Sequence, residues 1–317
     1  MNRICELLEI EVPVIEGGLA YIGNGLLAAA VSEGGGFGQV GSAGRTPENF
    51  EHEVLLAREA TNKPFGVNIP ISQHTDFSPY LDIIKKHKDL IKGVSLGAGN
   101  PKDLIPFIKD AGLKALVLTS TAFHSAKAES LGADIIVCEG YEAGGSNGPS
   151  ELTTFTLVPQ VKRAVSIPVV AAGGIVDGKS MAAAMILGAD GVQLGTKFVA
   201  TKECEAHDNF KNAILEAEDV STVILTRMLK GPLRVLKNEY CDKVHEVEKK
   251  YGTLEHVLPM VRGTYNKLAM KDGQIADGFA SCGQVASLID ELESAEDVVR
   301  RISSEAKELL SGGKIAL

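Results

Sequence analysis

The sequence lacks the cysteine patterns of disulfide-stabilised and zinc-binding proteins. Its five cysteines are an odd number, and no two of them have CxxC spacing, which argues against a disulfide framework and a zinc ribbon. We therefore expect reduced thiols, and we interpret Cys138, which ends an apolar run, as a core residue because free cysteines are usually buried. The histidines show no pair with metal-site spacing, so we expect no metal.

A surplus of basic residues is also missing. The chain has 32 Lys and Arg against 41 Asp and Glu, a formal net charge of −9, and no basic stripe that could neutralise a run of phosphates, so we expect no nucleic-acid partner. No apolar run is long enough to span a bilayer, and the first residues lack the basic and apolar regions of a signal peptide. We expect a cytoplasmic protein that does not bind membranes.

What the chain does contain is a regular alternation of short apolar runs and longer helical patterns. Its 317 residues, 44% of them hydrophobic and 23% charged, are typical of a globular protein built on an α/β barrel. Eight repeated strand–helix units predict parallel strands closed into a (β/α)8 TIM barrel. The predicted strands are Val12–Ile15, Gly36–Val40, Phe65–Ile69, Gly93–Leu96, Ala115–Leu118, Ile135–Cys138, Val169–Ala172 and Gly191–Gly195.

The helical patterns define the domain organisation. Near residue 200 the alternation stops, so we expect a barrel over residues 1–200, a small cap inserted over the barrel mouth at 201–270, and C-terminal helices packed on the barrel at 271–317. The last two helices are predicted at about Phe279–Leu292 and Ala295–Leu310. The helices of the barrel are predicted at Leu26–Glu33, Glu48–Ala60, Tyr80–His87, Lys102–Ala111, Ala122–Leu131, Thr156–Ala164 and Ser180–Leu187.

Glycines follow several predicted strands, at the barrel face where active sites lie. A glycine lets backbone N–H groups approach an anion closely, and the loops after strands seven and eight form a phosphate site in many barrels. Each glycine pair alone is consistent with an ordinary turn, but together they predict a phosphate-bearing ligand. The segments are Gly17-Gly18, the stretch from Glu139 to Gly148, Gly173-Gly174 and Gly195-Thr196.

Six motifs follow one another in a recognisable order: Gly17-Gly18, Gly66-Val67-Asn68-Ile69, Gly97–Pro101, Glu139–Gly145, Ile167–Ile175 and Val192–Phe198. Each is common in barrels, but the ordered set resembles the nitronate monooxygenase family, once called 2-nitropropane dioxygenases. That family also contains the FMN-dependent enoyl-acyl-carrier-protein reductases. The resemblance extends from about residue 10 to about residue 300.

The resemblance implies a bound FMN. Its phosphate is expected at the two glycine loops after strands seven and eight, and its isoalloxazine ring near Gly18, Leu19 and Asn68. For Asn68, at a strand's end, the alternative is a turn-capping role. Gln193 is expected beneath the flavin. The cofactor-binding residues that we expect are Gly18, Leu19, Asn68, Glu139, Ala143, Gly144, Gly173, Gly174, Gln193, Gly195 and Thr196.

The sequence departs from the family pattern directly after Gly145. The family usually has a histidine there, the catalytic base of nitronate monooxygenases, but this chain has Ser146 followed by Asn147. An imidazole with a reference pKa of about 6.5 accepts a proton at neutral pH, whereas an unassisted hydroxyl is a very weak base. Ser146 and Asn147 can still donate hydrogen bonds to a substrate oxygen, so we keep both as catalytic candidates.

Other ionisable residues lie near the expected catalytic face. His207, at the start of the cap, is the third catalytic candidate, although a lone histidine in a charged segment is more often a helix cap or a solvated residue. His124 follows the fifth strand. Four cap cations usually indicate a solvated face, but they could instead contact the phosphate of a carrier-linked or CoA-linked substrate or of NADPH. These are Arg227, Lys230, Arg234 and Lys237.

Three functions stay open at this point. The first is a reductase in which FMN, reduced by NADH or NADPH, passes hydride to an activated C=C bond such as that of an enoyl thioester; this route needs no base to remove a carbon-bound proton. The second is a nitronate monooxygenase, which reoxidises FMN with oxygen. The third is a non-redox barrel that binds a phosphorylated metabolite. We favour the first, and expect a homodimer that acts on a small-molecule or thioester substrate.

Overall fold

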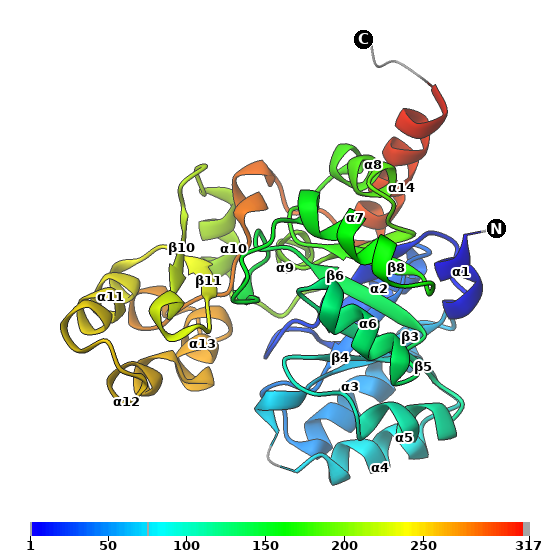
Figure 1. The fold of residues 1–317 in the computed structure, drawn as a ribbon, viewed down its shortest axis with the longest axis horizontal. Helices are drawn as coiled ribbons and strands as arrows, with labels where there is room; N and C mark the ends of the chain where they lie inside the picture. The colour runs from blue at the N-terminus through cyan, green and yellow to red at the C-terminus, as the bar shows by residue number, and fades with distance from the viewer. Residues whose placement is uncertain (1, 75, 313–317) are drawn as a thin grey trace.

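The computed structural model describes residues 2–74 and 76–312. Its larger part is a barrel of eight parallel strands in the order β1-β9-β8-β6-β5-β4-β3-β2, drawn on the right of Figure 1. The barrel closes where Ile15 of β1 bridges to Phe37, directly before β2. At this seam the Phe37 N–H donates to the Val14 carbonyl and the Glu16 N–H donates to the Phe37 carbonyl. The predicted TIM barrel is therefore confirmed.

The eight barrel strands correspond one to one with the eight predicted ones. They are β1 (Val14–Glu16), β2 (Gly38–Gly41), β3 (Phe65–Pro70), β4 (Ile91–Gly97), β5 (Lys114–Thr119), β6 (Ile135–Glu139), β8 (Val169–Ala172) and β9 (Gly191–Leu194). Successive side chains alternate between the barrel interior and the surrounding helices. Ile135 and Val137 belong to the inner cluster, whereas Ile136 and Cys138 belong to the outer one. The same alternation directs Glu139 inward at the end of β6.

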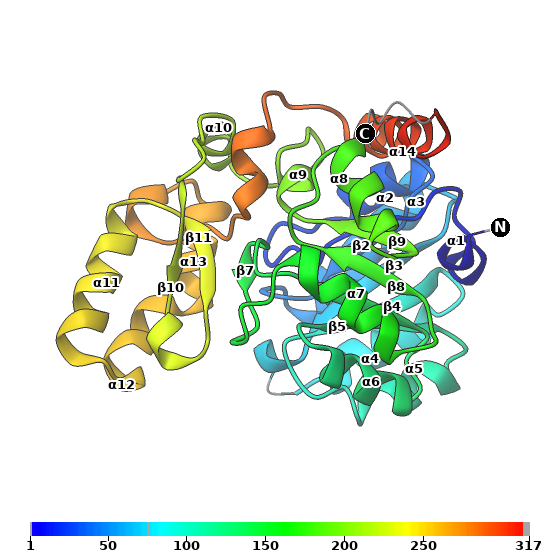
Figure 2. The same cartoon turned by 45° about the horizontal axis from the view of Figure 1, so that its top comes forward.

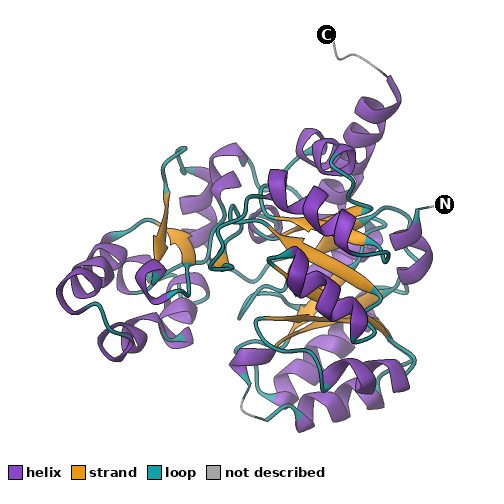
Figure 3. Ribbon diagram, in the orientation of Figure 1, coloured by secondary structure: helices purple, strands orange, loops and turns teal. Residues whose placement is uncertain are grey.

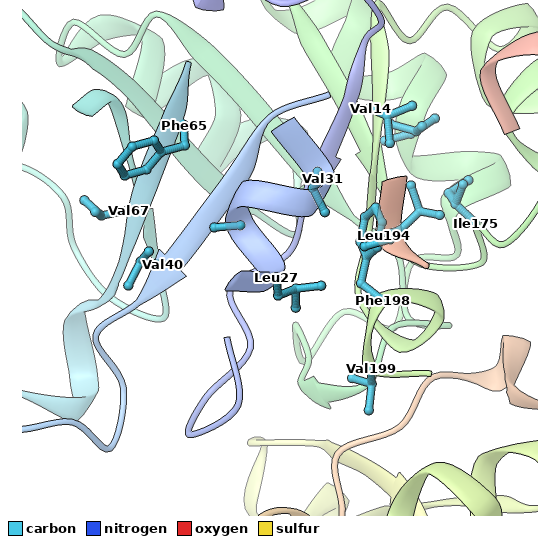
Figure 4. Close-up of a cluster of buried hydrophobic side chains, with 14 of the residues drawn as sticks. Val14, Leu27, Val31, Val40, Phe65, Val67, Ile175, Leu194, Phe198 and Val199 are labelled. Carbon is cyan, nitrogen blue, oxygen red and sulfur yellow. The ribbon is translucent and has the colours of Figure 1, made fainter. Parts of the chain in front are cut away.

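Helices surround the barrel (Figure 3). Seven follow their strands: α2 (Gly25–Glu33), α3 (Pro47–Ala60), α4 (Ser78–Lys86), α5 (Leu104–Asp110), α6 (Ala122–Ser130), α7 (Thr154–Ala164) and α8 (Gly178–Ile186). The eighth position is taken by α14 (Ala295–Gly312), which packs against α8 and α2. Figure 4 shows part of the outer core, where Leu27 and Val31 of α2 lie near the strand residues Val14 and Leu194. The short helix α1 (Arg3–Leu8) adds Ile4 and Leu8 to the inner cluster.

The chain between β9 and α14 forms the cap, which projects to the left of the barrel in Figures 1 and 2. Its sheet has the order β10-β11-β7, and β7 comes from the loop after β6. The elements are β7 (Gly145–Ser146), α9 (Thr196–Val199), α10 (Asp208–Leu215), β10 (Thr222–Leu225), β11 (Leu233–Leu236), α11 (Glu239–Tyr251), α12 (Leu254–Val257) and α13 (Gly263–Met270). Short 3-10 turns cover Ile71–Gln73, Arg227–Leu229, Leu258–Val261, Ile275–Asp277 and Gln284–Leu288.

The helix predicted over residues 279–292 is wrong. Ser281 instead forms an antiparallel bridge with Val235 of β11, and regular helix is limited here to the 3-10 turn Gln284–Leu288. Gly278 lies directly before the predicted helix and Gly283 lies inside it. Glycine disfavours helix because of its conformational freedom. A second bridge joins Thr201 to Glu293. The two ends of the cap insertion therefore lie side by side.

Two further predictions concern the state of the cysteines and the presence of membrane-spanning helices. All five cysteines are free and buried, and Cys138 is fully enclosed, which confirms its interpretation as a core residue. Within residues 2–74 and 76–312, no helix combines the length and the apolarity needed to cross a membrane.

Candidate active site

A cavity of about 590 Å³ opens at the carboxyl ends of the barrel strands. Every residue that we expected to bind the cofactor lines it, from Gly18 after β1 to Thr196 after β9. Parallel strands in a barrel end at one face, which is why segments far apart in the sequence meet here. The structure thus brings the predicted set together, while its assignment to a cofactor stays a prediction.

Two glycine loops form an open cradle at one side of this cavity. Gly173 and Gly174 have φ values of +85° and +76°, a conformation that non-glycine residues rarely adopt. A Cβ atom on Gly173 would lie 2.7 Å from the Gly140 carbonyl oxygen, whereas one on Gly174 or Gly195 would meet no atom closer than 3.7 or 3.8 Å. The backbone at Gly174 and Gly195 is therefore less crowded than at Gly173, and a Cβ at either position would make only ordinary van der Waals contacts, to Glu142 and Leu19.

A second close approach lies across the cavity, between β1 and β3. A Cβ on Gly18 would lie 2.3 Å from the Asn68 side chain, so only glycine allows this contact. The Asn68 amide donates to Ser95 Oγ of β4 at 2.8 Å. Asn68 is thus held by a neighbouring strand instead of capping its own turn, which decides against the turn-capping alternative. Gln193, which belongs to β9, lies beside Gly17 and is buried.

The ionisable side chains in the cavity lining are few. Among the described residues they are Glu139, Glu142 and Tyr21, with no histidine, lysine or arginine. Glu142 is held by Thr154, whose backbone N–H donates to both carboxylate oxygens at 3.0 and 2.9 Å. Glu139 has no comparable partner, and its burial raises its carboxyl pKa to about 8. Glu139 is therefore the carboxyl in this cavity that can exchange a proton near neutral pH.

The three catalytic candidates lie in different surroundings. Ser146 is exposed, pairs with Leu233 in the cap sheet and lines the cavity. Asn147 is nearly buried, and its side-chain amide donates to the carbonyls of Ala143 and Gly145 at 2.9 and 3.0 Å. Asn147 thus holds its own loop in place and lines an adjoining cavity. Only Ser146 of the three faces the main cavity.

His207 occupies a structural position. Its Nδ1 accepts the Asn209 N–H at 3.1 Å, which makes it the N-cap of α10, and it does not line the main cavity. Two cap cations are also engaged elsewhere: the exposed Arg227 pairs with the half-buried carboxylate of Glu151. Arg234 is buried, donates to the Tyr141 carbonyl at 3.0 Å and lies over the Tyr141 ring. The geometry therefore gives no support to phosphate binding by either arginine.

One segment of the lining was missed by the sequence interpretation. Phe279, Ser281 and Gly283, assigned there to a helix, line the cavity from the cap side. The Gly283 N–H donates to Thr196 Oγ1 at 2.9 Å, which ties this segment to the second glycine loop. The glycines Gly278 and Gly283, which disfavour a continuous helix, were the available signal. The segment's position over the cavity depends on pairing with β11, more than forty residues earlier in the chain.

Comparisons with known proteins agree with this geometry. The family model described as nitronate monooxygenase matches residues 1–92 and 76–305. The chain is 30% identical to a probable nitronate monooxygenase of Staphylococcus saprophyticus, covering 98% of this chain and 99% of that one. It is 29% identical to a (3aS,4S,5R,7aS)-5-hydroxy-7a-methyl-1-oxo-octahydro-1H-indene-4-carboxyl-CoA dehydrogenase of Mycobacterium tuberculosis, covering 96% and 95%. The structure of FabK from Thermotoga maritima superimposes with a TM-score of 0.91 at 38% identity, covering 98% and 97%. The chain therefore belongs to the nitronate monooxygenase family of flavin-dependent oxidoreductases.

Proposed function

We propose that this protein is an FMN-dependent reductase that uses NADH or NADPH to reduce the activated C=C bond of an enoyl thioester. The observation that carries the proposal is the cavity lining, in which Ser146 stands where the family has its catalytic histidine and no other described histidine takes its place. Reduction of an enoyl thioester needs a proton donor and no base that removes a carbon-bound proton. The likeness to FabK and to a CoA-thioester dehydrogenase supports the same substrate class.

Two observations favour FMN over a larger flavin. A Cβ on Gly174 or Gly195 would make only ordinary van der Waals contacts, so one terminal phosphate can approach these loops, and the Gly18 and Asn68 side can take the isoalloxazine ring. No glycine-rich turn between a strand and its following helix adds the adenine-binding fingerprint of a dinucleotide fold. When bound and reduced, the flavin supplies the hydride. The protein's own residues must supply the binding groups and the proton.

We assign these tasks to two residues. Glu139 is directed into the cavity, and as a protonated acid it can donate to the α-carbon of the substrate as the β-carbon is reduced. Ser146 can donate its hydroxyl hydrogen to the thioester carbonyl oxygen, which gains negative charge during the reaction. Neither role requires an imidazole.

The decisive experiment starts with the purified protein, its absorbance between about 350 and 500 nm and its released flavin. We expect FMN, bleached anaerobically by NADH or NADPH and reoxidised by an enoyl thioester with stoichiometric formation of the saturated product. Release of FAD, or a bleached flavin that no enoyl thioester reoxidises, would contradict the proposal.

Nitronate monooxygenase activity is the second candidate. The family model and the Staphylococcus relative favour it, and a preformed nitronate is already deprotonated, so its oxidation does not need the missing base. An oxygen-dependent turnover of nitronate with no response to NADH or NADPH would favour this candidate.

The homodimer stays a prediction, which sedimentation equilibrium would test.

A further inference from the structure

A second cavity of about 530 Å³, here called the outer groove, adjoins the main one. Ala98, Leu118, Glu139 and Ser146 line both. From this junction the outer groove extends over the ends of β4 and β5 to helix α6, away from the cap. It therefore gives a second route from the protein surface to the proposed reaction site.

The lining of the outer groove is mixed along its length. Val117, Leu118, Ala128 and Leu131 give it an apolar floor, while the side chains of Asn100, Ser120 and Asn147 offer amide and hydroxyl groups. Its volume lies within the usual range for small-ligand sites, about 300–1,000 Å³. Such a lining suits a narrow ligand in which short apolar segments alternate with amides.

The basic side chains of the groove lining all come from α6. Lys127 and His124, both exposed on α6, are the basic side chains in the lining of either cavity. Neither forms an ion pair within residues 2–74 and 76–312. By contrast, Arg227 and Arg234 of the cap are engaged with Glu151 and Tyr141. Among the described residues, an anionic group on a ligand in the groove thus finds an unpaired ammonium group at Lys127 and an imidazole at His124 on the same helix.

We propose that the outer groove binds the phosphopantetheine arm of the thioester substrate, with the phosphate at Lys127 and His124 and the thioester at the junction beside Ser146. This assignment rests on the proposed function. The arm carries a phosphate at one end, two amides separated by short apolar segments, and the acyl-bearing sulfur at the other end. The groove lining offers a matching group for each part: the basic side chains of α6 for the phosphate, amide and hydroxyl side chains for the amides, and the apolar floor for the short apolar segments. CoA and acyl-carrier proteins share the arm.

The test compares Lys127→Glu with Lys88→Glu, which makes the same change of charge and serves as the control. Lys88 is exposed in the turn before β4, at the opposite end of the barrel. Each is assayed with the same enoyl group on CoA, on an acyl-carrier protein and on N-acetylcysteamine, which lacks the phosphate. We expect Lys127→Glu to raise KM about tenfold for the CoA and carrier substrates, with kcat and the N-acetylcysteamine KM unchanged within twofold. Lys88→Glu should leave all three KM values unchanged.

Several results would overturn the assignment. A KM change limited to the carrier substrate would place the contact on the carrier's surface, and one limited to CoA would place it on the nucleotide. A weaker Kd for NADPH with unchanged thioester KM would make the groove a nicotinamide site.

Two substitutions of alanine by leucine on α6 provide an independent steric check. Ala128→Leu should block the groove and raise KM for both phosphopantetheine substrates. Ala126→Leu, on the same helix but lining neither cavity, should leave both KM values unchanged.

Binding of free CoA, measured calorimetrically, separates this inference from the proposed reaction. If wild type reduces no enoyl thioester but binds CoA, and Lys127→Glu weakens that binding about tenfold, the reaction is wrong and the groove assignment stands. If enoyl thioesters are reduced but Lys127→Glu changes neither CoA binding nor KM, the groove assignment is wrong and the reaction stands.

Discussion

At the scale of single residues, Glu139 determines how activity should depend on pH. Burial raises its carboxyl pKa to about 8, so the acid is protonated below that pH and loses its proton above it. If the protonated form is the donor, kcat should fall about tenfold per pH unit above about 8. Glu139→Gln should lower kcat by about 10²- to 10⁴-fold, the usual contribution of a positioned acid, and should abolish this alkaline limb.

The control for Glu139 is Glu142→Gln, because Glu142 lines the same cavity but is held by Thr154. This variant should keep the alkaline limb. Steady-state rates between pH 5 and 10, with the flavin content measured in each variant, provide the comparison. An alkaline limb that persists in Glu139→Gln would show that another group supplies the proton.

Ser146 tests which branch of the family chemistry this site serves. Its side chain borders both cavities, so a larger imidazole at this position displaces a substrate oxygen that the hydroxyl can bind. We expect Ser146→His to weaken enoyl-thioester reduction and to raise oxidation of neutral nitroalkanes by about 10²- to 10⁴-fold. Parallel assays of both proteins, in air and without oxygen, check this. Wild-type turnover of a neutral nitroalkane at a rate that the variant does not exceed would return nitronate monooxygenase to first place.

Glu16, at the end of β1, provides a stability test independent of substrate. It is fully buried and its pKa is raised well above the ordinary value by desolvation. Its Oε2 accepts the Gln39 N–H at 2.9 Å, while its Oε1 and Gln39 Oε1 have no partner. A proton on Glu16 removes a negative charge that burial disfavours. Glu16 is therefore expected to be neutral in the folded protein.

The sign of the Glu16 effect follows from its raised pKa. Unfolded Glu16 ionises near about pH 4.5 whereas the folded residue stays protonated, so its contribution to stability is present at low pH and is lost as pH rises. Glu16→Gln removes this loss, and its free energy of unfolding should exceed that of wild type by a margin that grows as the pH rises above about 5. Urea unfolding at several pH values measures the margin. A constant difference would mean that Glu16 is ionised in the folded state.

At the scale of elements, the segment from Phe279 to Gly283 closes the cavity by backbone contact. A Cβ on Gly144 would lie 2.6 Å from the Cys282 carbonyl carbon, so Gly144→Ala must push this segment away from the glycine loops. We expect the flavin Kd to rise at least about tenfold, measured by fluorescence of released flavin. Gly231→Ala is the matched control, since its Cβ would meet no atom within 4 Å. Equal flavin affinity in the two variants would show that this contact is unimportant.

The elements also show what the sequence could reveal. The barrel strands were predictable because each is a short apolar run whose meaning is local, and the glycine motifs at their ends located the cavity lining. The cap sheet was not predictable: β7 has two residues inside a glycine-rich loop, and its partner β11 lies almost ninety residues later. The catalytic role that we propose for Glu139 was similarly hidden, because burial raises its carboxyl pKa, and burial cannot be read from the motif that contains it.

At the scale of the whole molecule, α14 completes a barrel whose other parts lie before residue 200. Its residues Val298, Val299, Ile302 and Ala306 are buried between α8 and α2. We expect Ile302→Ala to lower the free energy of unfolding by about 2–5 kcal/mol, the usual cost of emptying a fully buried aliphatic site. Lys307→Ala, exposed on the same helix, should change it by less than about 0.5 kcal/mol. Chemical denaturation of both variants gives these values.

The late position of α14 has a consequence for synthesis of the protein. While the ribosome adds the roughly one hundred residues between β9 and α14, the faces of α8 and α2 that α14 will cover stay exposed. Domains generally fold as units during synthesis, and exposed apolar surface in an incomplete domain promotes aggregation. The nascent chain is therefore most dependent on chaperones in the interval between the emergence of β9 and that of α14, and premature termination inside the cap leaves a strand barrel whose α8 and α2 faces are uncovered.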